Sequence, residues 1–207
     1  MFSIDNVAPS LVGLADRQTV AALIAVTLCA LPCTTSAQSY FTAAVGAGRN
    51  DVECTVTRTC EKGDVAFKLL GGYRVAPWIA GEIVYLDFGE ARRASKQVED
   101  IYGTSAFGGG LGLHAHFASW AVTARVGAAR VANERGAEWL FPNPPPPSRA
   151  TTPKLMPYGG AAVGYRFSRY VGLAAAFDVT KSTWERTDGA SLTWNAVAAT
   201  AGLTIGR

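Results

Sequence analysis

Apolar residues alternate with small or polar residues along most of the chain beyond residue 38. In residues 67–74, for example, one set of alternate positions is Phe67, Leu69, Gly71 and Tyr73, and the other is Lys68, Leu70, Gly72 and Arg74. A period of two places the two sets on opposite faces of a β-strand. We therefore expect eight strands, in segments 41–48, 67–74, 79–85, 107–117, 120–128, 159–167, 171–179 and 197–205.

The connections between these strands alternate between short and long. Three are very short, around residues 75–77, 118–119 and 168–169, and four are long and polar, at about Asn50–Gly63, Glu90–Ser105, Asn133–Lys154 and Lys181–Ser191. Short turns at one end and long loops at the other are typical of an outer-membrane barrel. Strands of about ten residues, tilted near 40°, span about 25 Å, the height of the apolar band of such barrels.

The two faces of the strands differ in a way that favours this interpretation. One face is apolar without charge, whereas the other carries glycine, alanine and a few charges. A soluble, lipocalin-like barrel would turn the apolar face inward and leave a nearly uncharged Gly-Ala face in water. The pattern instead predicts an all-β protein, an eight-stranded antiparallel up-and-down transmembrane β-barrel with its apolar face in lipid.

The inward face then defines a polar network in the lumen. Its predicted members are Lys68, Arg74, Glu82, His114, His116, Arg125, Arg166 and Asp178. We expect Glu82 to pair with Lys68 or Arg125, because buried charges require partners, and we expect water beside the excess basic groups. Aromatic residues near the strand ends predict the girdles at the membrane interfaces: Tyr40, Tyr73, Trp78, Tyr85, Phe117, Trp120, Tyr165, Phe167, Tyr170 and Trp194.

The composition of the chain limits the class of protein and its partners. Only 17% of the 207 residues are charged, below the roughly 25% usual for soluble domains. The net charge of +3, without a basic run interleaved with aromatics, gives no reason to expect a nucleic-acid partner.

The N-terminus has the pattern of an exported protein. An apolar run at residues 20–31 precedes Thr35-Ser36-Ala37, a small-x-small cleavage pattern. We expect residues 1–37 to be a Sec signal peptide cleaved after Ala37, and residues 38–207 to form the barrel domain. The exported chain keeps Cys54 and Cys60, for which we expect a disulfide in an oxidising compartment. A metal site is the alternative, but no histidine or further cysteine lies nearby in the sequence.

Three segments resemble a known family. "FKLLGGYRVAPWIAGEIVYLDFG" (67–89), "ARVGAARV" (124–131) and "PYGGAAVGYRFS" (157–168) look like strands of the OmpA-type small outer-membrane barrels, the surface-antigen group that includes the OmpX and Ail proteins. The resemblance implies a Gram-negative outer-membrane location and contact with lipid, lipopolysaccharide and the barrel-assembly machinery. Because the sequence ends with the predicted barrel, we expect no peptidoglycan-binding domain after it. The chain departs from the family at Arg207, where such barrels usually end in an aromatic residue, and at Ala174 and Ala176, where the family often carries inward Arg and Glu.

The family motifs mark the barrel and leave its role open. We expect a structural, envelope-integrity role or an adhesion-like surface interaction, without enzymatic activity, cofactor or bound metal. A barrel enzyme that modifies lipid A, with His114 or His116 beside Ser119, is one alternative, and a narrow pore is another. Candidates for surface contact lie in the long connections. Trp139, Leu140 and Phe141 are candidates for contact with a host or envelope protein, and Arg92, Arg93 and Lys96 for contact with lipopolysaccharide phosphates.

Overall fold

The computed structural model describes residues 38–52, 59–94, 98–139, 150–151, 153–185 and 191–206. The predicted signal peptide, Cys54, Lys96, Leu140, Phe141 and Arg207 lie outside these ranges. No helix in the described part of the chain is long and apolar enough to cross a membrane.

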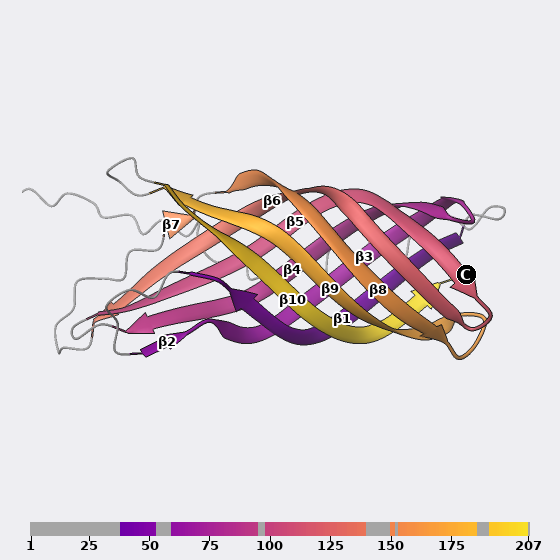
Figure 1. Cartoon of the computed structure of the whole chain (residues 1–207), viewed down its shortest axis with the longest axis horizontal. Coiled ribbons are helices and arrows are strands. Elements are labelled where there is room, and N and C mark those ends of the chain that lie inside the picture. The colour runs from indigo at the N-terminus through magenta and orange to yellow at the C-terminus, as the bar shows by residue number, and fades with distance from the viewer. Residues whose placement is uncertain are drawn as a thin grey trace, which may run out of the picture. The chain divides into compact units, whose positions relative to one another are not determined.

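Eight long strands form the wall, and two short ones lie beside it (Figure 1). The wall consists of β1 (Gln38–Asn50), β3 (Gly63–Ala76), β4 (Ile79–Ala94), β5 (Val98–Phe117), β6 (Trp120–Trp139), β8 (Lys154–Arg166), β9 (Val171–Glu185) and β10 (Ser191–Gly206). The short strand β2 (Thr59–Glu61) pairs with β4, and β7 (Ala150–Thr151) pairs with β6.

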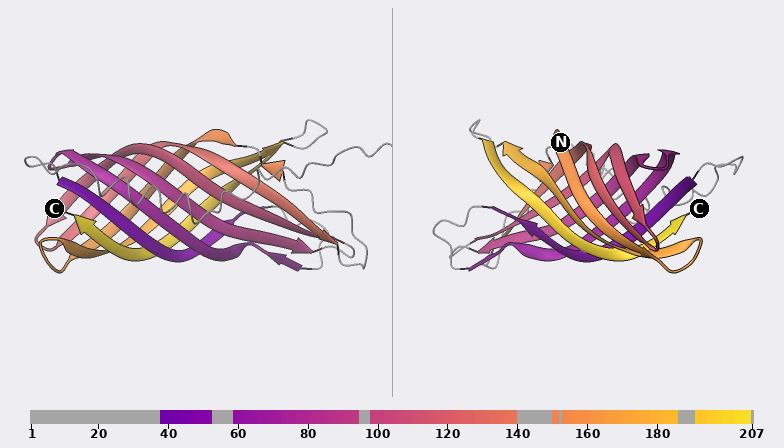
Figure 2. Two further views of the ribbon diagram at one scale, coloured as in Figure 1. Left: turned by 180° about the vertical axis from the view of Figure 1, so that it is seen from behind. Right: turned by 45° about the vertical axis from the view of Figure 1, so that its right-hand side comes forward.

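Each wall strand pairs antiparallel with its sequence neighbours, and the first strand pairs with the last. Pairing of β1 with β10 runs from Tyr40 opposite Gly206 to Asn50 opposite Ala196, and closes the sheet. Figure 2 shows the strands tilted around the closed wall from two further directions. The prediction of an eight-stranded antiparallel up-and-down barrel is confirmed.

The two ends of the barrel differ. The turn end, which carries the C mark in Figure 1, holds the short connections at residues 77–78, 118–119 and 167–170. The start of β1 and the end of β10 also lie there, because Tyr40 pairs with Gly206 and the Gly206 amide donates to the Tyr170 carbonyl. We call the opposite end the hairpin end.

The strands are longer than the sequence predicted, and this corrects the boundaries of the long connections. Of residues 90–105, predicted as a loop, residues 90–94 continue β4 and residues 98–105 belong to β5, and the two strands pair out to Ala94 opposite Glu99. Residues 133–139, also predicted as loop, continue β6, which pairs with β5 out to Trp139 opposite Val98. Backbone hydrogen bonds hold these polar segments as hairpins without needing an apolar face, so the hydrophobic pattern ended before the strands did.

A β-bulge in β4 marks the start of this extension. The register of β4 against β5 shifts between Asp87 and Glu90, and Gly89 has a φ of 75°. Before the bulge Leu86 and Phe88 face the lumen, and after it Ala91 does, so the bulge moves the inward set by one residue.

The outer face carries the apolar side chains. Large apolar residues exposed on the middle of the wall include Val45, Ile83, Phe107, Leu111, Val126, Val163, Phe177 and Leu203. Aromatic residues exposed near the turn end are Tyr73, Trp78, Phe117, Trp120, Tyr165, Phe167 and Tyr170, in the positions predicted for a girdle. Tyr40 and Trp194 were wrongly assigned to the girdles, because the Tyr40 hydroxyl contacts the lumen residue Glu82 and Trp194 is buried against Tyr102.

A polar ring bounds the apolar part of the outer face. Between the turn end and this ring, no outward side chain on the described parts of the eight strands is charged. The ring consists of Arg49, Asp87, Arg130, Lys181 and Asn195. It lies about ten residues from the turn end, so the apolar belt below it is about 25 Å high.

Candidate functional site

The first buried ion pair in the lumen joins Lys68 of β3 and Asp178 of β9. Lys68 Nζ lies 2.5 Å from Asp178 Oδ2, and the two side chains are 1% and 0% exposed. The Tyr158 hydroxyl donates to the other carboxylate oxygen, Oδ1, at 2.5 Å. Both oxygens of Asp178 are therefore engaged by donors, as a carboxylate buried away from water requires.

The second pair joins Glu82 of β4 and Arg125 of β6 and lies nearer the turn end. Arg125 Nε donates to Glu82 Oε2 at 2.8 Å, and the Tyr40 hydroxyl donates to Glu82 Oε1. Of the two partners that the sequence offered Glu82, the structure uses Arg125, while Lys68 pairs with Asp178.

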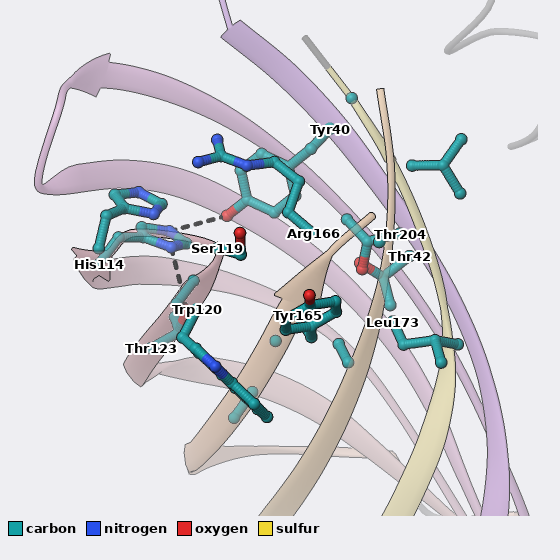
Figure 3. Close-up of a pocket in the computed structure, with 18 of the residues that line it drawn as sticks. Tyr40, Thr42, His114, Ser119, Trp120, Thr123, Tyr165, Arg166, Leu173 and Thr204 are labelled. Atoms are coloured by element: carbon teal, nitrogen blue, oxygen red, sulfur yellow. Dashed lines mark hydrogen bonds between the residues drawn. The ribbon is translucent and has the colours of Figure 1, made fainter. Parts of the chain in front are cut away.

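Hydrogen bonds to Tyr40 and Thr123 determine which nitrogen of His114 carries a proton. His114 Nε2 lies 3.1 Å from the Tyr40 hydroxyl oxygen, whose own proton is donated to Glu82. His114 Nε2 must then be the donor to Tyr40, and in the neutral ring Nδ1 accepts from the Thr123 hydroxyl at 3.0 Å. Figure 3 shows these bonds as dashed lines. The ring is fixed as part of a structural network, with both nitrogens in use.

An apolar cluster fills the lumen around the Lys68–Asp178 pair and beyond it toward the hairpin end. Leu70, Leu86, Phe88 and Val131 are at most 1% exposed, and inward alanines of β3, β5, β6 and β10 pack with them. Beyond this cluster, Asn133 accepts from Ser182 and donates from Nδ2 to the Thr183 carbonyl at 2.9 Å. The described middle of the lumen is thus packed with side chains.

A cavity of about 130 Å³ lies on the other side, at the turn end (Figure 3). Its wall includes the turn residues Ser119, Arg169 and Tyr170. The room comes from small inward residues of β6, β8 and β9, namely Ala121, Ala162, Gly164, Gly172 and Ala174. Ala174 is one of the two positions at which the family resemblance led us to expect a larger charged side chain.

Four predicted lumen residues, besides Arg125, line this cavity: Arg74, His114, His116 and Arg166. Arg74 Nη1 donates to Gln38 Oε1 at 2.9 Å, and its guanidinium lies 5.4 Å from the centre of the Tyr40 ring. Arg166 Nη2 donates to the Ala118 carbonyl at 3.2 Å. The rings of His114 and His116 are stacked, with centroids 6.3 Å apart.

Sequence reasoning missed Tyr40, Thr123, Tyr158 and Asn133 as lumen residues. The alternation held the signal for two of them, because Tyr40 shares a face with Thr42, and Tyr158 shares one with Gly160. Tyr40 was predicted to lie in a girdle because it is aromatic. Thr123, Tyr158 and Asn133 were left unassigned because none of them is charged.

The predicted surface-contact and disulfide residues are described only in part. Arg92 is exposed and forms a 3.6 Å pair with Glu90, whereas Arg93 and Trp139 lie in β4 and β6 and not in loops. Cys60 is disulfide-bonded. Its predicted partner Cys54 lies outside the described ranges, so the Cys54–Cys60 pairing stays a prediction. Within the described residues, no group of three or more His, Cys, Asp or Glu side chains is placed to hold a metal ion.

Comparison with known proteins supports the fold. No protein-family model matches the chain, and no curated protein sequence matches it. Among solved structures, Neisserial surface protein A matches with a TM-score of 0.52 at 12% identity, over 82% of this chain and 98% of that one. A major outer-membrane protein from Thermus thermophilus matches at 0.52 and 8% identity, over 82% and 99%.

A third structure, the outer-membrane protein OprG from Pseudomonas aeruginosa, matches with a TM-score of 0.50 at 9% identity, over 83% of this chain and 96% of that one. Likenesses at this level of identity establish architecture. The chain has the fold of the small eight-stranded outer-membrane β-barrels.

Proposed function

We propose that the protein is an integral outer-membrane barrel whose role is structural, or is a surface interaction made through its hairpin end. The observation that carries this proposal is a closed wall with a charge-free apolar belt on its outer face. Such a belt is stable in lipid and exposes far too much apolar surface for a chain in water. The turn end then faces the periplasm and the hairpin end faces outward, as in barrels with short periplasmic turns.

The packed lumen supports a structural role over transport. Two buried ion pairs and the apolar cluster around Phe88 occupy the middle of the barrel. A pore would require these groups to separate and leave charges without partners, which is costly in a low-dielectric interior.

The histidines support the same choice over a lipid A-modifying enzyme. An enzyme of that kind needs a histidine beside a serine on the lipid-facing surface. His114 and His116 both line the lumen cavity and not the lipid-facing surface. Both ring nitrogens of His114 are also engaged, by Tyr40 and Thr123, so His114 is not available as a base toward Ser119. We further propose, from the sequence alone, that residues 1–37 direct export through the Sec pathway.

Electrophoresis of the outer-membrane fraction, with and without boiling in SDS, tests this proposal. A folded barrel resists SDS, so the unboiled protein should migrate differently from the boiled one, and both should be found in that fraction. A protein found soluble in the periplasm, with no mobility shift, would refute the membrane assignment. Planar-bilayer recording of the same preparation should show no stable ion conductance.

A further inference from the structure

The cavity at the turn end is lined by an excess of cationic side chains. Four arginines contribute to its wall: Arg74, Arg125, Arg166 and Arg169. None of its lining residues in the described part of the chain is Asp or Glu. The nearby carboxylate of Glu82 is already engaged by Arg125 and Tyr40. The positive charge of this cavity is therefore not balanced by the described residues.

Two guanidinium donors of the arginines that line this cavity are also left without acceptors. Arg125 is 8% exposed, and its Nη1 is buried with no hydrogen-bond partner among the described residues. Arg74 Nε is buried and unpartnered in the same way. Buried donors in native proteins nearly always have a partner. Both unpaired groups belong to arginines that line the cavity, and a small shift of either side chain would bring its N–H to an acceptor held there.

The cavity is large enough for a small acceptor. Its volume of about 130 Å³ is several times what one ordered water requires, so it accommodates a small oxyanion together with water. Glycines and alanines of β6, β8 and β9 leave this room. Arg125 and Arg166 also lie on β6 and β8, whereas Arg74 comes from β3 and Arg169 from the turn at residues 167–170.

We propose that this cavity is a binding site for a phosphate-type oxyanion. The planar guanidinium presents paired N–H donors that match two oxygens of a phosphoryl group, and charge-assisted hydrogen bonds of this kind are strong where water is partly excluded. Arg74 and Arg166, near the turn-end limits of β3 and β8, are the principal charges. Arg125 lies five residues into β6 and is more deeply buried, and the Ser119 hydroxyl supplies a neutral donor. The anion is either free phosphate or the phosphoryl group of a lipid headgroup.

Titration calorimetry on the full barrel tests the site, using inorganic phosphate, a neutral detergent and a fixed chloride concentration. We expect saturable binding near one phosphate per barrel. The double variant Arg74→Gln/Arg166→Gln should weaken it at least tenfold, because both lost groups are cationic and neither has a carboxylate partner among the described residues. The matched control Arg92→Gln removes an exposed arginine at the hairpin end and should leave binding unchanged.

A second titration, with a short-chain phosphatidylglycerol in the same detergent, identifies the source of the anion. Binding of the lipid alone, lost in the double variant, assigns the site to a headgroup, and binding of inorganic phosphate assigns it to the free anion. Absence of both, or binding that the double variant retains, overturns the proposal. The SDS mobility shift verifies that each variant is folded, and the result does not depend on where the protein resides in the cell.

Discussion

At the scale of single residues, the lumen is held by charges that depend on one another. Lys68 and Asp178 have no contact with bulk water, and each satisfies the other within a wall of glycine and alanine. By contrast, Asp51 lies beyond β1 in solvent, where hydrogen bonds from Lys62 and then Arg49 hold the pKa of its carboxyl below the usual value. The same type of ion pair thus has different consequences in the two places, because water screens only the second.

Replacing Asp178 should reveal this difference. Asp178→Asn leaves the Lys68 ammonium buried without a counter-charge, and we expect a loss of about 3–5 kcal/mol in the free energy of unfolding. Urea titration of the protein in lipid vesicles, followed by tryptophan fluorescence, measures it. The double variant Lys68→Met/Asp178→Asn removes both charges and should regain most of the loss.

The control for this prediction is Asp51→Asn, which removes an exposed carboxylate with two basic partners. Its unfolding midpoint should equal that of the wild type within error. Equal losses for Asp178→Asn and Asp51→Asn would show that burial of the Lys68 pair is unimportant.

At the scale of elements, the bulge in β4 joins two parts of the barrel with different surroundings. Below it the outward positions belong to the apolar belt, and beyond it β4 and β5 continue as a hairpin. Gly89 provides the backbone conformation that the bulge needs, with its φ of 75°. A Cβ at this position would lie 2.7 Å from Asp64 Cβ and 2.8 Å from the Val65 carbonyl oxygen.

We therefore expect Gly89→Ala to destabilise the barrel by about 1–3 kcal/mol, through the left-handed backbone conformation and the contact with β3. The same urea titration measures this change. Gly81→Ala is the matched control in the same strand, because a Cβ there would meet no atom within 4 Å. Similar midpoints for the two variants would contradict the role assigned to Gly89.

At the scale of the whole molecule, the position of the belt determines which part of the wall contacts lipid. The polar ring that includes Arg49, Arg130 and Lys181 marks one edge, and the exposed aromatics of the turn end mark the other. Leu111 lies near the middle of this belt and is 50% exposed, whereas Leu155 pairs with Arg130 at the level of the ring.

An arginine placed on the outer face should test how far each position lies from the middle of the apolar belt. Leu111→Arg should cost about 2–4 kcal/mol of folding free energy in vesicles, and Leu155→Arg about 0–1 kcal/mol, because the cost of a lipid-facing arginine falls from the midplane to the interface. Urea titration of both variants in vesicles of one lipid measures the difference. Equal costs at the two positions would show that the belt is not where the ring and the girdle place it.

The sequence by itself determined the strands, their two faces and the closed barrel, because a period of two fixes which side chains share a face whatever the strands pair with. It placed Lys68, Glu82, Arg125 and Asp178 in one lumen for that reason. Only the tertiary structure decided that Lys68 meets Asp178, 110 residues away, and that Glu82 meets Arg125. Those pairings depend on the stagger of the strands around the barrel, which no local pattern encodes.

The same division explains the hairpins and the cavity. Residues 90–94, 98–105 and 133–139 carry no uniform alternation, and their strands are held by backbone hydrogen bonds to a neighbour that only the fold supplies. The cavity arises where small residues of β6, β8 and β9 come together with Arg125 and Arg166 of β6 and β8, Arg74 of β3 and Arg169 of a turn. Local sequence fixed the character of each of these side chains, and the closure of the barrel brought them together.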